Sequence, residues 1–279
     1  MFKIVYKKEL SPGIFHMDIE APRVAKKAKA GQFIVLRVNE LGERVPLTIA
    51  DFDVEKGTIT LIFQVLGAST MQLSALNEGD SIVDFAGPLG QPSEISGSMG
   101  TVVCIGGGIG VAPVYPIARA IHEAGNKVIS IMGAKTKDIL IFEDKMRAIS
   151  DEVIIATDDG SYGVKGFVTT ALQQLVDRGE KIDQVTAIGP GIMMKSVCDA
   201  TRPLGIKTIV SLNPVMVDGT GMCGGCRVQV GDEMKFACVD GPEFDGHLVD
   251  FNNLMSRGRM FREQEAKAKD HVCNIGLGR

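Results

Sequence analysis

The sequence lacks the features that direct a protein to nucleic acid or into a membrane. It has no surplus of basic residues, because 30 Lys and Arg stand against 34 Asp and Glu, for a formal net charge of −4. Nucleic-acid-binding domains usually carry a basic patch, so we expect no nucleic-acid ligand. The most apolar stretch, residues 101–121, contains four glycines and two prolines and does not resemble a membrane span of about 20 apolar residues. The first ten residues, MFKIVYKKEL, lack the apolar core of a secretion signal, so we expect a cytoplasmic protein.

The sequence also has no internal repeat and no low-complexity tract. With 279 residues, 45% of them hydrophobic, the chain can form roughly two domains of about 100–200 residues with substantial cores. The pattern of apolar runs divides it into three parts. We expect a flavin-binding barrel over residues 1–97, a nucleotide-binding α/β domain over 98–211, and an iron–sulfur module with a C-terminal arm over 212–279.

The first part has the pattern of a small antiparallel β-barrel. Turn residues such as Ser11-Pro12-Gly13 and Gly79-Asp80 separate short apolar runs, and one helix is expected at Thr70–Leu76. The six expected strands are 2–6, 14–19, 33–38, 46–50, 58–65 and 81–85.

The second part alternates strands with helices, which predicts a parallel sheet with helices on both faces. The expected strands are 101–105, 127–132, 152–156, 184–188 and 207–211, and the expected helices are 112–124, 143–149, 166–178 and 191–202. After residue 211 this rhythm ends in a glycine-rich segment with cysteines. A charged helix or arm is expected over 256–270.

The strongest chemical signal is the pattern D-x4-C-x2-C-x11-C, formed by Asp218, Cys223, Cys226 and Cys238. Plant-type [2Fe–2S] proteins use C-x4-C-x2-C and a distant fourth Cys, so Asp218 stands at the first ligand position. An anionic carboxylate can replace a thiolate, and the glycines of this segment allow the backbone to wrap closely around a cluster. The pattern therefore predicts an iron–sulfur site.

Two other readings of these cysteines remain open. One Asp and three Cys could hold a structural zinc ion, which would make the chain a zinc-stabilised nucleotide-binding regulatory module. Disulfides are disfavoured in a reducing compartment. Cys104 and Cys198 fall in an expected strand and helix and are read as packing residues.

Glycine-rich loops follow several expected strands of the second part. Residues 105–113, IGGGIGVAP, join a strand to a helix, where backbone amides and a helix N-terminus bind phosphate. Loops 157–163 and 189–194 follow two further strands, and ligands of open α/β sheets bind at that edge. No acidic or basic residue is clearly placed to recognise the ribose 2′ position, so the sequence does not distinguish NAD from NADP as the ligand. In the first part, Glu43–Ile49 and Gln64–Thr70 are the flavin candidates.

Together these segments resemble the ferredoxin–NADP reductase superfamily. The resemblance rests on RVPLTIAD, QVLGAST, GGGIGVAP, TDDGSYGVKG, GPGIMM and residues 218–238, and it covers nearly the whole chain. The chain resembles the electron-transfer subunit of dihydroorotate dehydrogenase. It is still more similar to the small subunit of NADH-dependent ferredoxin–NADP oxidoreductase, an electron-bifurcating transhydrogenase also called sulfide dehydrogenase. Asp218 carries that distinction, because the first family has four Cys ligands and the second has one Asp and three Cys.

The resemblance implies an NAD(P)H-dependent flavin oxidoreductase subunit that exchanges electrons between a partner's flavin and NAD(H), through a [2Fe–2S] cluster and FAD. It implies a large partner subunit with a second flavin and [4Fe–4S] clusters and, through it, ferredoxin and NADP(H). The implied FAD-binding residues are Arg44, Pro46, Leu47, Thr48, Gln64, Gly67, Ala68, Ser69 and Thr70. The implied NAD(H)-binding residues are Gly108, Gly110, Asp158, Asp159, Gly189, Pro190 and Met193. No side chain is given a catalytic role, because the cofactors carry the hydride chemistry.

Three positions depart from the superfamily pattern. Val45 stands where the flavin-binding Arg often lies, and Arg44 is one residue earlier. Leu47 replaces an aromatic residue that often stacks on the flavin, so an aliphatic group is expected against the ring. Ile188 replaces a Cys near the nicotinamide, which agrees with the absence of a catalytic side chain.

Overall fold

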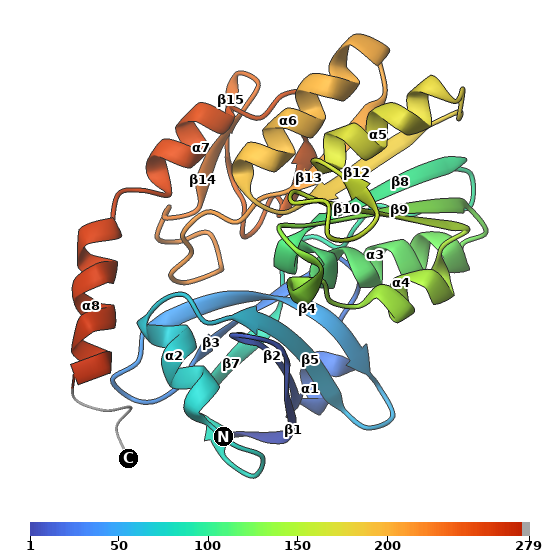
Figure 1. The fold of residues 1–279 in the computed structure, drawn as a ribbon. Coiled ribbons are helices and arrows are strands. Elements are labelled where there is room, and N and C mark those ends of the chain that lie inside the picture. The colour runs from blue at the N-terminus through green and yellow to red at the C-terminus, as the bar shows by residue number, and fades with distance from the viewer. Residues whose placement is uncertain (275–279) are drawn as a thin grey trace.

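The N-terminal part folds into a nearly closed antiparallel barrel of seven strands. The structure is a computed structural model and describes residues 1–274. The sheet order is β6-β1-β2-β5-β4-β3-β7, and it forms the lower part of the molecule in Figure 1. The strands are β1 (Phe2–Ser11), β2 (Ile14–Glu20), β3 (Phe33–Arg37), β4 (Arg44–Asp53), β5 (Thr58–Gln64), β6 (Ser81–Ile82) and β7 (Asp84–Leu89). Two helices accompany them, α1 (Pro22–Ala25) and α2 (Ala68–Ala75).

Side chains that alternate along a barrel strand contribute to two different cores. On β3, Ile34 and Leu36 enter the barrel interior, whereas Phe33 and Val35 belong to the core shared with the rest of the molecule. Successive side chains of a strand point to opposite faces, so one strand can serve two cores. The barrel therefore has a filled interior and, over part of its wall, an apolar outer face.

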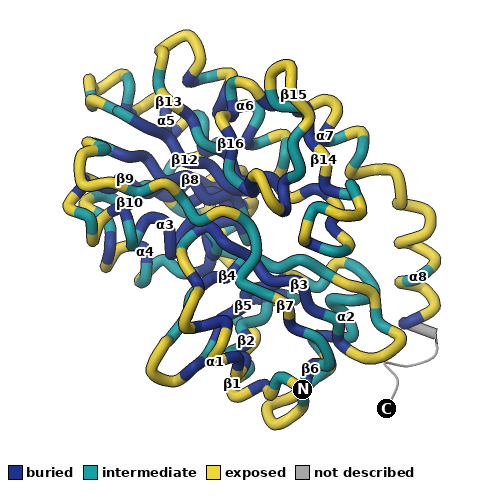
Figure 2. The backbone as a smooth tube through the Cα atoms, turned by 180° about the vertical axis from the view of Figure 1, so that it is seen from behind, coloured by how far each residue is buried: buried dark blue, intermediate teal, exposed yellow. Residues whose placement is uncertain are grey.

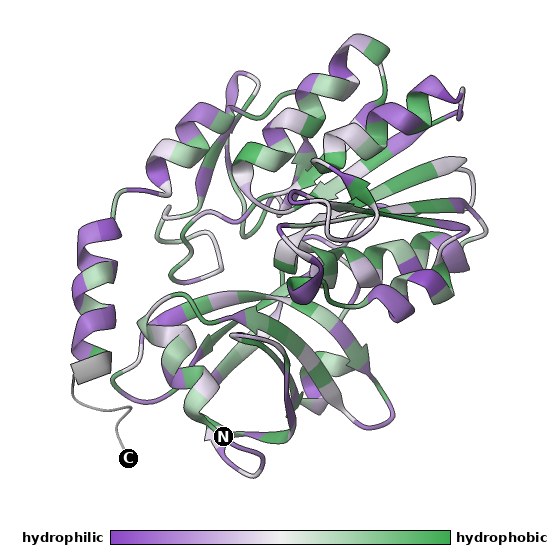
Figure 3. Ribbon diagram, viewed as in Figure 1, coloured by the Kyte–Doolittle hydropathy of each residue, from purple (hydrophilic) through white to green (hydrophobic). Residues whose placement is uncertain are grey.

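The second part is a seven-stranded sheet with the order β11-β10-β9-β8-β12-β13-β16. Its first six strands are parallel, and β16 pairs antiparallel with β13. The strands are β8 (Thr101–Gly107), β9 (Lys127–Ala134), β10 (Glu152–Thr157), β11 (Val164–Lys165), β12 (Gln184–Ile188), β13 (Lys207–Ser211) and β16 (Glu243–Asp245). Figure 3 shows the central strands as nearly continuous hydrophobic segments, as expected for a sheet covered on both faces.

Helices cover both faces of this sheet, as the sequence predicted. Side chains of α3 (Val111–Glu123) and α4 (Glu143–Ile149) share one core with it. Those of α5 (Val168–Asp177) and α6 (Gly191–Thr201) share the other. Short 3₁₀ turns, η1 (Gly108–Gly110), η2 (Lys137–Ile139) and η3 (Arg202–Leu204), complete the connections.

The C-terminal part is a hairpin with two helices. β14 (Arg227–Val230) and β15 (Glu233–Phe236) form the hairpin. The expected arm at 256–270 is divided between α7 (Phe251–Arg257) and α8 (Arg262–Asn274). α8 is mostly exposed and runs down to α2 of the barrel (Figures 1 and 2).

Ionic contacts and apolar packing join the barrel to the nucleotide sheet. Asp51 of β4 pairs with Arg119 of α3 at 2.8 Å and with Lys145 of α4 at 3.8 Å. Ala50 and Ile62 of the barrel belong to the same buried cluster as α3. In the described part of the chain, no helix is both long and apolar enough to cross a membrane.

Candidate functional site

Four donor side chains of the C-terminal part form two separate pairs. In the first, the Cys223 thiol donates to Asp218 Oδ1 across 3.0 Å. In the second, the sulfur atoms of Cys226 and Cys238 lie 3.2 Å apart. Cys223 is exposed, whereas Cys226 and Cys238 are buried. The structure therefore brings the four predicted ligands together two by two, with Cys223 exposed in one pair and both cysteines buried in the other.

Glycine conformation makes this loop possible. Gly221 and Gly224 have φ values of +86° and +68°, a left-handed region that other residues rarely adopt. Gly219 lies so close to the barrel that a Cβ there would be 2.8 Å from Leu89 Cδ1 and 3.0 Å from Val35 Cγ2. The loop that carries the four donors is thus seated on the outer face of β3 and β7.

The two pairs differ in their electrostatics. Hydrogen bonds from the Cys223 thiol, the Thr220 hydroxyl and the Met222 amide lower the pKa of Asp218. Burial, with the neighbouring Cys226, raises the pKa of the Cys238 thiol to about 12. An ionised carboxylate is therefore available at one end, whereas the buried Cys238 thiol needs a nearby cation, such as a bound metal, to lose its proton.

This donor set fits a two-iron cluster better than a single ion. A tetrahedral zinc site needs four donors around one point. Among residues 1–274, no group of three or more His, Cys, Asp or Glu gathers closely enough to hold one ion. Two pairs of donors suit two irons with two protein ligands each. A disulfide does not fit, because 3.2 Å far exceeds an S–S bond of about 2.05 Å.

The predicted glycine loop lies at the carboxyl edge of the nucleotide sheet. Gly108 has φ +57°, with no atom within 4 Å of where a Cβ would stand, so its backbone faces open space. Gly110 directly precedes α3. It has no such free space, since a Cβ there would overlap the carbonyl oxygen of Ile188. The loop thus combines an open backbone turn with a close approach between neighbouring strands.

The loop after β12 lies directly beside it. A Cβ at Gly189 would be 2.8 Å from Met193 Cε and 3.2 Å from Gly107 O. Pro190 precedes the first turn of α6 and Ile188 is buried, so the predicted residues Gly189, Pro190 and Met193 form one wall of this edge. Two glycine loops and two helix N-termini therefore meet where a pyrophosphate can bind backbone amides.

Asp158 and Asp159 follow β10 at the same edge. The Asp158 amide donates to Ala134 O at 3.0 Å. Asp159 Oδ1 accepts from the Ser161 amide and hydroxyl, at 2.9 and 2.7 Å, and these bonds lower the pKa of its carboxyl. Two strands separate β10 from β12 in the sheet, so the carboxylates lie at the far end of the same edge.

The first flavin candidate occupies the outer face of β4. Val45 and Leu47 pack toward the barrel interior, so Arg44, Pro46 and Thr48 alternate onto the other face. Leu47 is therefore directed away from this face, which differs from its expected place against the flavin ring. The departure at Val45 has a related explanation, since a cation at position 45 would point into the core.

The second flavin candidate lies beside the first. The antiparallel register that pairs Ile49 with Leu61 brings the start of β4 next to the end of β5, where Gln64 is exposed. The chain then turns into α2, where Thr70 Oγ1 accepts from the Gly67 amide at 3.1 Å. A Cβ at Gly67 would meet no atom within 4 Å. The amides of Ala68 and Ser69 thus begin a helix beside open space, which suits a phosphate.

The three candidate regions share one side of the barrel wall. Val35, which contacts the cluster loop at Gly219, is paired with Pro46 on the neighbouring strand. Further along the wall, Ala50 shares a buried cluster with α3, the helix that follows the glycine loop. The wall therefore carries, in order, the cluster loop, the flavin candidate and the nucleotide edge.

The sequence analysis missed a buried contact between the segment that follows β7 and the C-terminal part. Glu243 Oε1 accepts from Ser93 Oγ at 2.6 Å, and the Ser93 amide donates to Ala30 O at 2.9 Å. Burial, and to a lesser degree the nearby Glu94, raises the pKa of Glu243. No local pattern could have revealed this contact, because 150 residues separate its partners.

Glu243→Gln should flatten the pH dependence of stability. A carboxyl whose pKa is raised on folding binds its proton more tightly when folded, so its contribution is complete below its ordinary pKa of 4.5 and is lost as pH rises through the raised value. Each unit of elevation corresponds to about 1.4 kcal/mol. We expect Glu243→Gln to gain free energy of unfolding relative to wild type between pH 5 and 8 in denaturant titrations. Glu20→Gln, at an exposed position of β2, is the control, and equal pH slopes in wild type and Glu243→Gln would contradict the assignment.

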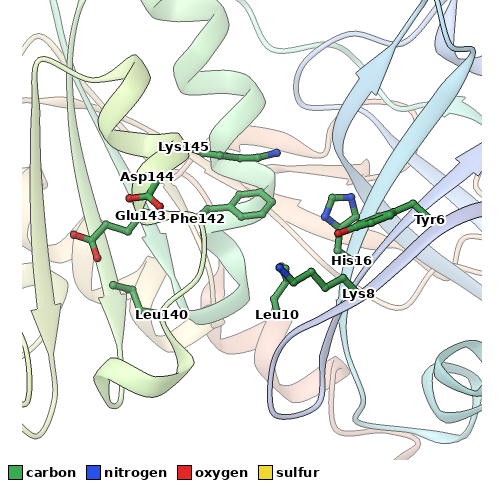
Figure 4. A pocket seen from close by; sticks show the side chains of 9 residues that line it. All are labelled: Tyr6, Lys8, Leu10, His16, Leu140, Phe142, Glu143, Asp144 and Lys145. Carbon is green, nitrogen blue, oxygen red and sulfur yellow. The ribbon is translucent and has the colours of Figure 1, made fainter.

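A cavity of about 510 Å³ lies between the barrel and the nucleotide domain, away from these regions. Figure 4 shows side chains of β1 and β2 on one side and those of residues 140–145, at the start of α4, on the other. It is lined by Tyr6, Lys8, Leu10, His16, Leu140, Phe142, Glu143, Asp144 and Lys145. None of the predicted site residues is among them.

Two family models match the parts of the chain that the geometry singles out. The iron–sulfur cluster binding domain of dihydroorotate dehydrogenase B matches residues 213–250, which include all four donor residues. The oxidoreductase NAD-binding domain matches residues 104–199, which include both glycine loops.

Whole-chain relatives agree with these matches. The chain is 50% identical to a Thermotoga maritima homologue of the dihydroorotate dehydrogenase B (NAD(+)) electron transfer subunit, over 94% of this chain and 92% of the relative. It is 34% identical to that subunit itself from Streptococcus pneumoniae, over 87% of this chain and 94% of the relative. The solved structure of an NADH-dependent reduced ferredoxin–NADP oxidoreductase, studied for flavin-based electron bifurcation, aligns with a TM-score of 0.93 and 47% identity over 98% of both chains.

Proposed function

The chain belongs to the family of dihydroorotate dehydrogenase B electron-transfer subunits and their homologues, and from this premise we propose that it is the small electron-transfer subunit of an electron-bifurcating, NADH-dependent ferredoxin–NADP oxidoreductase. It is an NAD(P)H-dependent flavin oxidoreductase subunit that uses FAD, an iron–sulfur cluster and NAD(H). When bound, these groups supply the hydride and single-electron chemistry. The protein contributes binding, orientation and exclusion of water.

The cluster loop supports this proposal most directly. Asp218 and Cys223 provide one pair of anionic ligands, and Cys226 and Cys238 provide the other. The loop rests on Val35, the strand partner of Pro46 on the proposed flavin face. A cluster held there and a flavin on β4 would lie over neighbouring strands of the barrel wall, close enough for electrons to pass between them.

The nucleotide edge orients its ligand through backbone groups. Gly108 and Gly110 supply amides at the start of α3, and Gly189 and Pro190 approach them from the next strand. Ile188 and Met193 are apolar, so the nicotinamide ring would be positioned by packing rather than by a proton donor. The side chains of Asp158 and Asp159 are available to the ribose hydroxyls.

The chain is one subunit of a heteromeric complex, and we infer that its partner is a larger subunit with a second flavin and [4Fe–4S] clusters. The surface beside exposed Cys223 supports a docking site there. Met222 is 88% exposed and Val217 is 52% exposed, so apolar side chains surround the outer end of the cluster loop. Such a surface lets a partner's redox centre approach the cluster while water is excluded.

Asp218 separates this proposal from a role as dihydroorotate dehydrogenase subunit, which the 34% identical relative would otherwise suggest. A four-cysteine site is expected in that enzyme, whereas this chain places a carboxylate at the first position. A zinc-stabilised regulatory module is disfavoured, because the donors form two pairs instead of one tetrahedron.

Metal and flavin analysis of the anaerobically purified complex tests the proposal. We expect about two iron atoms and two acid-labile sulfides bound by this chain, FAD released on denaturation, and bleaching of the flavin absorbance by NADH. Mass spectrometry of the native complex should identify a partner with flavin and [4Fe–4S] sequence motifs. A colourless, zinc-containing chain, or a dihydroorotate dehydrogenase as partner, would contradict the proposal.

Asp218→Cys is expected to retain the cluster but change its midpoint potential, because ligand type is one of the determinants of potential. The measurement is a redox titration followed by electron paramagnetic resonance. Asp232→Cys, in the turn of the β14–β15 hairpin, is the matched control and should leave the potential unchanged. An unchanged midpoint in Asp218→Cys would remove Asp218 from the ligand set.

A further inference from the structure

Two arginines hold the short backbone segment between Cys223 and Cys226. Arg227 Nη1 donates to Gly224 O at 2.9 Å, and Arg257 Nη2 donates to Gly225 O at 3.1 Å. Each of the two residues between the cysteines therefore has its carbonyl bound by a guanidinium group. Among the described residues, neither arginine forms an ion pair with a carboxylate.

One of these peptide groups is also hydrogen-bonded to a sulfur atom. The Gly225 amide, which belongs to the same peptide unit as the Gly224 carbonyl, donates to Cys223 Sγ at 3.4 Å. A guanidinium bound to a carbonyl polarises the peptide and strengthens the bond made by its N–H. Arg227 thus acts on the sulfur through one peptide unit, and Arg257 binds the next.

Arg257 comes from a helix that is fixed on two sides. α7 begins with Asp250, whose side chain accepts from the Asn253 amide at 2.9 Å, and Phe251 and Leu254 bury its inner face. Met255 packs at the start of α6, where a Cβ at Gly191 would be 3.3 Å from its Cγ. Arg257 is half-buried at the end of this helix, outside the segment 213–250 that matches the cluster-binding domain.

We propose that Arg257 and Arg227 are positioning residues that hold the loop between Cys223 and Cys226 and raise the reduction potential of the cluster. The cluster gains one negative charge on reduction, so two unpaired cations and a polarised amide beside its sulfur ligand favour the reduced form. Arg257 has the larger effect, because Arg227 is exposed and its charge is screened by solvent. This proposal rests on the proposed function, since it assumes that the four donors hold an iron–sulfur cluster.

The test compares midpoint potentials of the holo-complex by redox titration with electron paramagnetic resonance detection. Arg257→Met should lower the equilibrium constant for one-electron reduction by about tenfold, a shift of about 59 mV to lower potential. Arg259→Met removes the same charge two residues further along the arm, at an exposed position, and should leave the potential unchanged. Equal potentials in Arg257→Met and Arg259→Met would overturn the proposal.

Arg257→Lys keeps the charge and tests the proposal even if the Met variant loses its cluster. Its equilibrium constant for one-electron reduction should stay within about threefold of the wild-type value. Amide hydrogen exchange at Gly224 and Gly225 should be faster than in wild type, because a lysine cannot reproduce the planar geometry of the guanidinium. Wild-type exchange rates at these amides would contradict the positioning role. Iron and sulfide analysis of the unmodified chain tests the proposed function separately.

Discussion

Cys226→Ser is expected to deprive the chain of its iron–sulfur cluster. Cys226 is one of the buried pair, and an alcohol at this position is far less acidic than a thiol and a poor ligand for iron. Even changes outside the ligand set cost about 10–100-fold in metal affinity, so loss of a ligand should lower bound iron by more than about tenfold. Iron and sulfide analysis and the electron paramagnetic resonance spectrum of the reduced protein measure this. Electron transfer to the partner should be lost while NADH still bleaches the FAD.

Cys198→Ser provides the matched control. Cys198 is as buried as Cys226, at 1% exposure each, but it lies on α6 in the apolar core. Both variants place a hydroxyl in a buried site, where a missing hydrogen bond costs about 1–3 kcal/mol. Cys198→Ser should therefore lose comparable stability and keep its iron. If Cys226→Ser also kept its iron, the ligand assignment would be wrong, and iron loss in both would point to a general folding defect.

The parallel strands were predicted most accurately from sequence. The expected strands 184–188 and 207–211 coincide with β12 and β13, and the helix expected at 143–149 coincides with α4. Buried parallel strands are continuous apolar runs that end at loops, so their bounds are visible locally. The domain bounds after residues 97 and 211 remain predictions, and β16 shows that the C-terminal part also contributes a strand to the nucleotide sheet.

The barrel strands were predicted less accurately, because they continue from apolar runs into polar residues. The run 81–85 was expected as one strand but contains all of β6 and the beginning of β7, and the barrel has seven strands instead of six. β4 begins at Arg44, before the apolar run that was recognised. The inward direction of Leu47 could have been inferred, since Val45, Leu47 and Ile49 alternate along the strand.

In the candidate site, too, local sequence patterns could be predicted and contacts between distant residues could not. The spacing of Asp218, Cys223, Cys226 and Cys238 identified the donors, but only the structure divides them into pairs. Arg257 lies 32 residues from the carbonyl it binds. Contacts of this kind depend on how α7 packs after folding, which no sequence spacing encodes.

Gly110→Ala is expected to disrupt the nucleotide edge. Gly110 has φ −60°, which alanine adopts readily, so the cost does not arise from backbone strain. It arises from contact, because the new Cβ would overlap the Ile188 carbonyl oxygen and lie 2.8 Å from its carbon. Those atoms belong to a buried backbone and cannot rotate away, so α3 and the β12–α6 loop must separate. Overpacking of this kind costs about 1–3 kcal/mol, measured by denaturant unfolding.

The same displacement should weaken NADH binding, because the amides of the two glycine loops no longer converge. We expect the dissociation constant, measured by calorimetric titration, to rise by at least about tenfold, which corresponds to about 1.4 kcal/mol. Gly258→Ala is the matched control: its φ is −63°, and its nearest new contacts, at 3.5 and 3.7 Å, are ordinary. Gly258→Ala should bind NADH like wild type. Wild-type NADH affinity in Gly110→Ala would show that the nucleotide does not depend on the junction of these two loops.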